Sequence, residues 1–213
     1  DGNHLQLIPS PELINWTAGG IITSALVTNS QEPSVAYIGH ASLIALVRKV
    51  GASSYSPEQF TSINNGNTWT DAGYCSPMVF QTANDAQVVS PLIVYDSTRK
   101  AVIAVSSMRN NNANAYNGEG EFVYANSLTS VWSSPSSWTY RGRFNRPIPN
   151  QYPPRGYPRI LQFNDSSFIG IVTDNYAFRS STGVIEGIYS FSINYRKLLL
   201  GNQSKICDGC TPV

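Results

Sequence analysis

The sequence carries little charge and has no long apolar run. Charged residues make up 13% of its 213 positions and the formal net charge is +1, so it lacks the basic surface that nucleic acid or an anionic membrane attracts. A membrane-spanning helix needs about 18 or more consecutive apolar residues, and the sequence has no such stretch. We therefore expect no nucleic-acid partner and no insertion into a membrane.

Histidine and cysteine are also scarce. His4 and His40 have no partners at the spacing of metal ligands, and Cys75 stands alone. Cys207 and Cys210 form one C-x-x-C pair, which is either a local disulfide, part of a site completed elsewhere, or a plain tail. Phosphate-loop, dinucleotide-binding and nucleophile-elbow motifs are absent as well. We expect no metal site and no cofactor.

The length fits one all-β domain over residues 1–213. Proline and glycine are frequent, with 13 and 16 copies, and no sustained helical stripe of apolar residues occurs. The chain begins with Asp1 and lacks the apolar region of a signal peptide. We interpret it as a processed or excised part of a larger protein.

Three segments of the chain repeat one pattern. Each opens near a proline (Pro33, Pro91, Pro158), continues through a β-branched or aromatic run, turns at Gly-His, Asp-Ser or Asn-Asp, and returns through a second apolar run. This pattern is typical of a tight hairpin followed by outer strands. It predicts four-stranded antiparallel blades at approximately 30–75, 86–143 and 155–201. A β-sandwich with similar strands is the alternative.

One turn between two predicted strands resembles the Asp-box, S-x-D-x-G-x-T-W, of sialidases and several other β-propeller families. Its matching residues are Ser62, Asn64, Gly66, Thr68 and Trp69. Asn in place of Asp can still cap a tight turn, and glycine accepts a positive φ. The resemblance implies a propeller blade in which the tryptophan lies buried between blades. A degenerate copy occurs at Ser133–Thr139.

The surrounding residues extend the resemblance. Sialidases carry a Glu at the start of one inner strand and an Arg about fifteen residues later, and Glu32 and Arg48 have this relation. A hairpin returns its last residue to the level of its first, so the two side chains should meet at one edge of the sheet. Arg109 ends the corresponding strand of the second repeat, and Tyr157 begins the third.

The resemblance implies a role for each of these four residues. Glu32 takes the place of the catalytic glutamate, Arg48 and Arg109 those of two carboxylate-binding arginines, and Tyr157 that of the nucleophile. Guanidinium groups bind carboxylates bidentately, and a tyrosine beside a carboxylate base can attack an anomeric carbon. Each residue also has a structural explanation, as a strand end, a turn residue or a packing residue.

A proline- and arginine-rich segment precedes the third repeat. Residues 143–159 combine prolines with Tyr152 and Arg159, and they predict an extended linker that is either a specificity loop for sugars or a plain crossing between blades. Residues 110–117 predict an exposed loop, after which Glu119 or Glu121 could supply an acid. The first arginine and the acid of sialidases find no recognisable counterpart.

These features leave three functional hypotheses. The favoured one is recognition of an acidic, sialic-acid-type glycan at a cell or virion surface, and the second is hydrolysis of such a glycan by a sialidase- or endosialidase-like site. The third is a structural domain of a capsid, spike or tail fibre. By the resemblance, the chain is long enough for about half of a propeller ring. This suggests a fragment, a subunit that closes a ring in a homo-oligomer such as a trimer, or blades that have lost the enzymatic activity.

Overall fold

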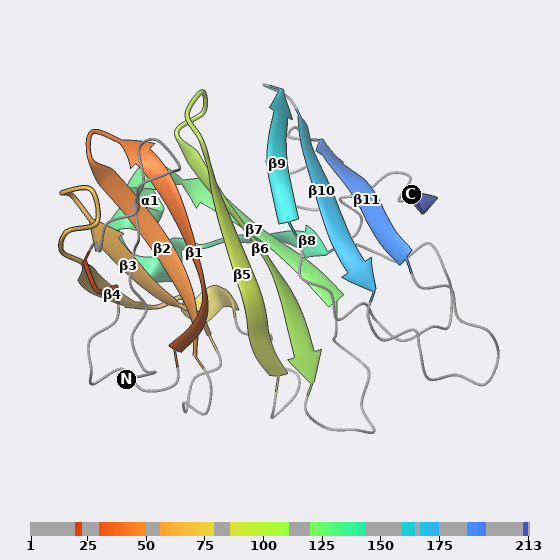
Figure 1. Ribbon diagram of the computed structural model, residues 1–213, viewed down its shortest axis with the longest axis horizontal. Helices are drawn as coiled ribbons and strands as arrows, with labels where there is room; N and C mark the ends of the chain where they lie inside the picture. The colour runs from red at the N-terminus through yellow and green to blue at the C-terminus, as the bar shows by residue number, and fades with distance from the viewer. Residues whose placement is uncertain are drawn as a thin grey trace, which may run out of the picture.

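The computed structural model is almost entirely β in the residues that it describes. The described residues are 20–22, 30–49, 56–78, 86–110, 120–143, 159–164, 167–174, 187–194 and 211–212. They form three four-stranded sheets that stand side by side (Figure 1). Within this described part, no helix is long and apolar enough to cross a membrane.

Each sheet is a meander of consecutive antiparallel strands. The first contains β1 (Ser30–Gly39), β2 (Ser42–Lys49), β3 (Glu58–Ser62) and β4 (Thr70–Tyr74). The second contains β5 (Ala86–Asp96), β6 (Ala101–Asn110), β7 (Gly120–Ser127) and β8 (Tyr140–Arg143). The third contains β9 (Arg159–Asn164), β10 (Ser167–Asp174), β11 (Gly187–Asn194) and β12 (Thr211–Pro212). The sequence predicts that the third blade ends near residue 201, and in the structure its outermost strand is β12, which lies beyond that position.

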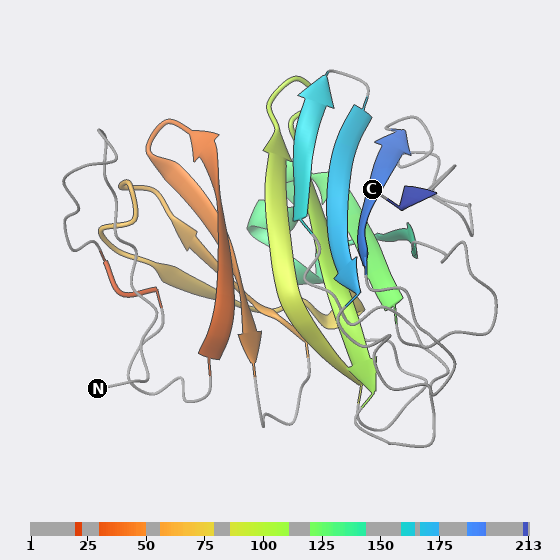
Figure 2. The same cartoon turned by 45° about the vertical axis from the view of Figure 1, so that its right-hand side comes forward.

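Consecutive sheets meet along their first strands. Strand β1 lies beside β5, and β5 lies beside β9 (Figure 2). The described strands never return to an earlier sheet, in contrast to the Greek-key connections of a β-sandwich. The four-stranded antiparallel blades predicted from the repeats are thus confirmed, and the sandwich alternative is not.

Strand β2 is buried on both of its faces. Ile44 and Leu46 pack toward the second sheet, while the alternate residues Ala45 and Val47 pack on the opposite face with Phe60. A strand covered on both faces reads as a continuous apolar run rather than as an alternation. This explains the sequence LIALV in β2 and the sequence AVIAV at the start of β6.

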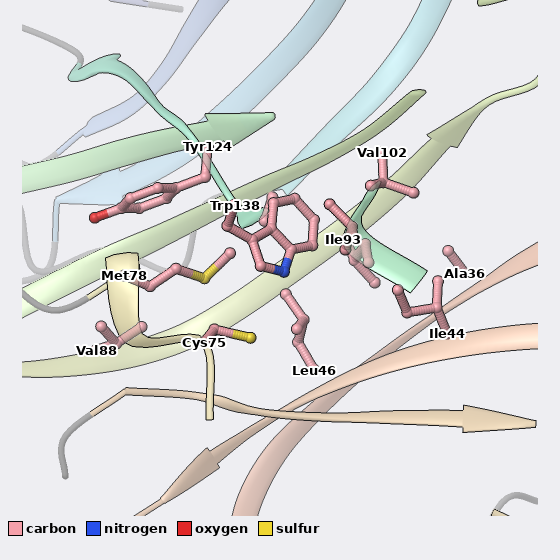
Figure 3. Close-up of a cluster of buried hydrophobic side chains, with 12 residues drawn as sticks. Ala36, Ile44, Leu46, Cys75, Met78, Val88, Ile93, Val102, Tyr124 and Trp138 are labelled. Atoms are coloured by element: carbon pink, nitrogen blue, oxygen red, sulfur yellow. The ribbon is translucent and has the colours of Figure 1, made fainter. Parts of the chain in front are cut away.

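The largest core lies between the first and second sheets. Trp138 from the second sheet packs near Leu46 and Cys75 from the first (Figure 3). The buried members of this core are Ala36, Ile44, Leu46, Cys75, Met78, Val88, Ile93, Val102, Ala104, Tyr124, Val131 and Trp138. Burial raises the pKa of the Cys75 thiol, so this side chain behaves as an apolar core residue.

One buried polar contact joins the same two sheets. The Gln59 side chain of β3 is completely buried. Its Nε2 donates to the carbonyl oxygen of Val131 over 2.9 Å, and its Oε1 accepts from Trp138 Nε1 over 3.0 Å. A buried amide with both ends bonded fixes how one sheet sits on the other.

The turn from Ser62 to Trp69 joins β3 to β4 and is closed by its own side chains. Ser62 Oγ accepts from the N–H of Gly66 over 2.9 Å, and Asn64 Oδ1 accepts from the N–H of Thr68 over 2.9 Å. Gly66 has the positive φ of 80° that glycine favours. Trp69 is half-buried against the Ala45, Val47 and Phe60 face, which points away from the second sheet. It therefore does not lie between the first two blades.

The corresponding connection of the second sheet is helical. Its degenerate repeat at Ser133–Thr139 predicts a similar turn, but the chain forms α1 (Leu128–Ser133) and the 3-10 helix η2 (Pro135–Ser137). Ser127 caps α1 by accepting from the N–H of Ser130. This helical connection leads to Trp138, which lies in the core and is 2% exposed.

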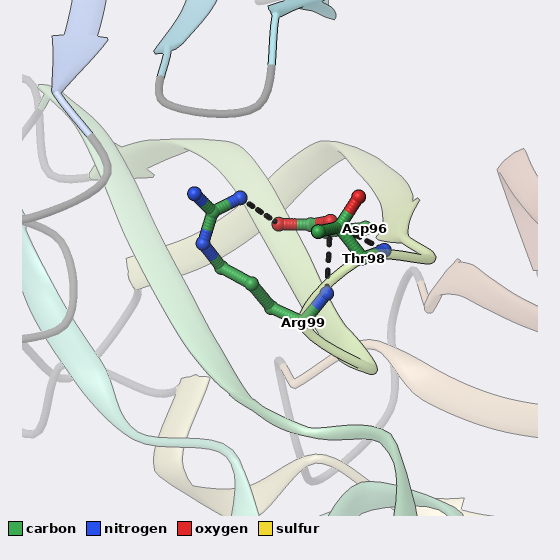
Figure 4. Close-up of polar contacts among 3 residues, drawn as sticks. All are labelled: Asp96, Thr98 and Arg99. Atoms are coloured by element: carbon green, nitrogen blue, oxygen red, sulfur yellow. Dashed lines mark hydrogen bonds and ion pairs between the residues drawn. The ribbon is translucent and has the colours of Figure 1, made fainter.

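The β5–β6 hairpin depends on a buried aspartate. Asp96 Oδ1 accepts from the backbone N–H groups of Thr98 and Arg99 over 3.0 and 3.2 Å (Figure 4). Its Oδ2 lies 2.9 Å from Arg99 Nη1. This local network stabilises the turn at the end of the sheet opposite the predicted site residues.

Candidate functional site

The candidate site lies at one end of the first two sheets, which we call the rim: the start of β1 and β5 and the end of β2 and β6. Gln31 pairs with Arg48 in the first sheet, and Gln87 pairs with Arg109 in the second. The two arginines thus occupy equivalent backbone positions. Antiparallel pairing requires this, because the end of a returning strand reaches the level where the first strand began.

Glu32 and Arg48 meet at the rim, as the hairpin geometry predicts. Arg48 Nη1 lies 3.1 Å from Glu32 Oε1. The Arg48 side chain is 10% exposed and the Glu32 side chain is 24% exposed. A partly buried pair of this kind is less screened by salt than a pair in open solvent.

A β-bulge places Glu32 outside the regular ladder. The register of β1 with β2 shifts between Gln31 and Ser34, so Glu32 and Pro33 pair with no residue of β2. Glu32 has a φ of 47°, which is unfavourable for a residue other than glycine and costs on the order of 1–3 kcal/mol. Bulges of this kind redirect side chains and are frequent at functional sites.

The same bulge recurs in the second sheet. Ser90 has a φ of 48°, precedes Pro91, and falls where the register of β5 with β6 shifts between Val89 and Leu92. Its backbone N–H donates to Glu32 Oε2 over 2.6 Å. The Glu32 carboxylate therefore binds a guanidinium with one oxygen and the next blade's backbone with the other.

The remaining predicted rim residues have less structural description. Arg109 lies near the end of β6, and Arg159 begins β9, the first strand of the third sheet. Tyr152 and Tyr157 lie outside the described residues, as does Glu119. The structure brings Glu32 and Arg48 into contact, and that Glu32, Arg48, Arg109 and Tyr157 share one site stays a prediction.

A second ion pair at the rim was not anticipated from the sequence. Lys49 Nζ lies 2.9 Å from Glu58 Oε2 and donates to Ser30 Oγ over 3.3 Å. Both charged side chains are about 95% buried. The Arg48–Lys49 dipeptide is the signal that could have revealed this pair, because successive residues of a strand point to opposite faces.

Burial dominates the electrostatics of this second pair. It raises the pKa of Glu58 above its ordinary value of 4.5, an effect that the nearby Asp71 carboxylate reinforces and Lys49 opposes. Burial, Glu58 and Asp71 also raise the pKa of Tyr74, a residue that is 42% exposed at the end of β4. This end of the first sheet thus carries an arginine, carboxyl groups and an accessible tyrosine.

Metal ligands are not grouped at this site. In the part of the chain that the structure describes, no cluster of three or more His, Cys, Asp or Glu side chains is placed to hold a metal ion.

No protein-family model and no curated protein matches the sequence. Solved structures match by fold. The α-L-arabinofuranosidase of Fusarium graminearum, family GH93 in complex with arabinobiose, is 12% identical with a TM-score of 0.63 over 99% of this chain and 58% of that one. An α-L-arabinanase of Penicillium chrysogenum complexed with arabinobiose is 11% identical, with a TM-score of 0.59 over 99% and 59%.

A viral enzyme shares the same fold. The endosialidase of phage phi92 is 12% identical, with a TM-score of 0.58 over 90% of this chain and 31% of that one. These comparisons confirm the fold class predicted from the sequence, an all-β fold of β-propeller blades. The chain spans less than three fifths of the length of these proteins. At sequence identities this low, the similarity to these structures shows the fold of this chain alone.

Proposed function

We propose that this chain binds carbohydrate at the rim, and that its ligand is an acidic sugar of the sialic-acid type. The proposal is supported by the fold, which this chain shares with two structures complexed with arabinobiose and with an endosialidase. It places the protein on the outside of a cell or on a virion, as a subunit of a homo-oligomer such as a trimer or as part of a larger chain.

The contact between Glu32 and Arg48 carries the proposal. It shows that a guanidinium is held at the rim by the hairpin itself, within 3.1 Å of a carboxylate oxygen. A planar guanidinium recognises carboxylates through parallel N–H bonds, which lysine cannot reproduce. Arg109 occupies the equivalent backbone position of the next blade, and we take it as the second carboxylate-binding arginine that the resemblance implies.

An exposed tyrosine, Tyr74, lies at the same end of the first sheet, on the Glu58 face and opposite the Arg48–Glu32 pair. Tyr74 is 42% exposed at the end of β4, and its flat aromatic ring offers apolar contact area, at low entropic cost, to a sugar chain that extends across this end of the sheet. Affinity at a single such site is small and rises when several copies bind together, which suits an oligomeric attachment protein.

Hydrolysis is the second candidate function. The resemblance to sialidases assigns Glu32 as the base and Tyr157 as the nucleophile, and the observed Glu32–Arg48 contact favours this reading. Both Glu32 oxygens, however, already accept hydrogen bonds. A carboxylate whose two oxygens are both bonded within the protein is poorly placed to take a proton from a nucleophile, so we favour recognition over turnover.

Binding of 3′-sialyllactose and polysialic acid, with lactose as the neutral comparison, tests the proposal by NMR titration. Arg48→Met should weaken binding of the acidic sugars about 10- to 100-fold, because a hydrogen bond to a charged group contributes about 1.5–3 kcal/mol. Arg99→Met is the matched control, since Arg99 lies at the opposite end of the second sheet. Equal binding of lactose and sialyllactose, or an unchanged affinity in Arg48→Met, would contradict the proposal.

Turnover is measured separately with a fluorogenic sialoside. Release of the fluorophore by the unmodified chain and its loss in Glu32→Gln would establish the second candidate. Binding of the sialoside without release of the fluorophore would support recognition without turnover. Absence of binding to every sugar on a glycan array would favour a structural domain of a capsid, spike or tail fibre.

A further inference from the structure

Two donors from different blades converge on the Glu32 carboxylate. Arg48 Nη1 binds Oε1 at 3.1 Å, and the Ser90 N–H binds Oε2 at 2.6 Å. Together they bind both oxygens of one carboxylate group, with a charged donor on one oxygen and a backbone donor on the other. In this chain the carboxylate that fills the set is its own.

Glu32 is the most accessible acid of the three ion pairs found among the described residues. Its side chain is 24% exposed, against 6% for Glu58 and none for Asp96. Asp96 also bonds the turn that contains it, and Glu58 faces the opposite side of the first sheet. Only the Glu32 carboxylate combines solvent access with a position between two blades.

The bulge allows this carboxylate to leave. Glu32 and Pro33 pair with no residue of β2, so no ladder pair breaks when the Glu32 side chain turns outward. Both donors are less accessible than this carboxylate, because the Arg48 side chain is 10% exposed and Ser90 is 3% exposed, against 24% for the Glu32 side chain. The Glu32 carboxylate is therefore the member of this set that lies nearest to solvent.

We propose that the Arg48 guanidinium and the Ser90 N–H form a carboxylate-binding site that Glu32 closes in the unliganded chain. A ligand carboxylate and the Glu32 carboxylate exclude each other at this site. For an acidic sugar the inference rests on the proposed function, whereas for a simple carboxylate such as acetate it rests on the two donors alone.

Removal of Glu32 should strengthen ligand binding, because this side chain occupies the site. If the open form is about one molecule in ten, the apparent affinity for a ligand is about tenfold weaker than that of the open site. Glu32→Ala removes the competitor and should strengthen binding of 3′-sialyllactose by about this factor. A glutamate that contacts the sugar directly would instead lose affinity when removed.

The experiment compares the unmodified chain with Glu32→Ala, Glu32→Gln and Glu58→Gln. Glu58→Gln removes the same charge on the other face of the first sheet and controls for electrostatics at a distance. Acetate, with acetamide as its neutral counterpart, is titrated while the melting temperature and the amide NMR signal of Ser90 are followed. Glu32→Gln keeps the shape of the side chain and serves if Glu32→Ala does not fold.

We expect acetate, and not acetamide, to raise the melting temperature of Glu32→Ala and to shift the Ser90 amide signal, and the unmodified chain should need about tenfold more acetate for the same response. The double variant Glu32→Ala/Arg48→Met should lose the response. Absence of an acetate response in Glu32→Ala and in Glu32→Gln overturns the inference. An acetate response without any binding of sialyllactose overturns the acidic-sugar function and leaves the carboxylate site standing.

Discussion

Replacing Gln59 by leucine tests the contact between the first two blades. Gln59 is completely buried, donates to the carbonyl oxygen of Val131 and accepts from Trp138 Nε1. Leucine has nearly the same volume, so the substitution leaves little empty space. It does leave one carbonyl and one indole N–H buried without their partner.

The expected loss of unfolding free energy follows from these two groups. Each buried polar group left without a partner costs about 1–3 kcal/mol, and the additional apolar surface of leucine returns roughly 1 kcal/mol. We therefore expect a net destabilisation of about 1–5 kcal/mol. This is a large share of the roughly 5–15 kcal/mol that holds a typical domain folded.

Urea unfolding followed by tryptophan fluorescence measures this loss. Gln31→Leu is the matched control, because Gln31 is exposed on β1 and the same substitution there should change stability by less than about 0.5 kcal/mol. Combining Gln59→Leu with Trp138→Phe removes one of the two unsatisfied groups, so the double variant should lose less than the sum of the two single losses. A cost for Gln59→Leu below about 1 kcal/mol, or strictly additive losses, would refute the reasoning.

The remaining predictions concern a turn, a hairpin, a buried acid and a thiol. Asn64→Ala should lower the unfolding free energy by about 1–2 kcal/mol, while Asn64→Asp, which keeps the acceptor for the Thr68 N–H, should change it little in urea unfolding. Asp96→Ala should cost about 2–4 kcal/mol by the same measurement, since three donors lose their acceptor. The neutral form of Glu58 contributes stability that is complete below pH 4.5 and is lost as the pH rises through its raised pKa. Glu58→Gln should flatten that decline in urea midpoints measured at increasing pH, and an unchanged slope would speak against the raised pKa. Peptide mapping after iodoacetamide treatment should find Cys75 unmodified until the chain unfolds, because the thiol is buried and its pKa is raised.

The repeats made the architecture predictable. Strand-forming runs, their prolines and the Gly-His or Asp-Ser turns depend on residues close together in the chain, and the structure places hairpins at these positions. The helical connection before Trp138 was not predictable in the same way. Its local sequence resembles the Ser62–Trp69 turn, and burial of Trp138 against the first sheet accompanies the different backbone there.

The site was predictable in part for a similar reason. A hairpin returns Arg48 to the level of Glu32 whatever surrounds it, so the 3.1 Å contact follows from strand length and pairing. The Arg48–Lys49 dipeptide indicates a charge on each face of β2, but the connection to β3 has a length that gives no register, so the sequence did not identify Glu58 as the partner of Lys49. The placements of Tyr152 and Tyr157 stay predictions.

The sequence by itself determined the strands, the turn chemistry and the return of Arg48 to Glu32, because each of these depends on periodicity and on neighbours within one hairpin. Only the tertiary structure decided that Glu32 binds the Ser90 N–H, 58 residues away, and that Gln59 binds Trp138, 79 residues away. Such contacts depend on how one sheet stacks against the next. That stacking is set by the summed packing of both faces, which no local pattern encodes.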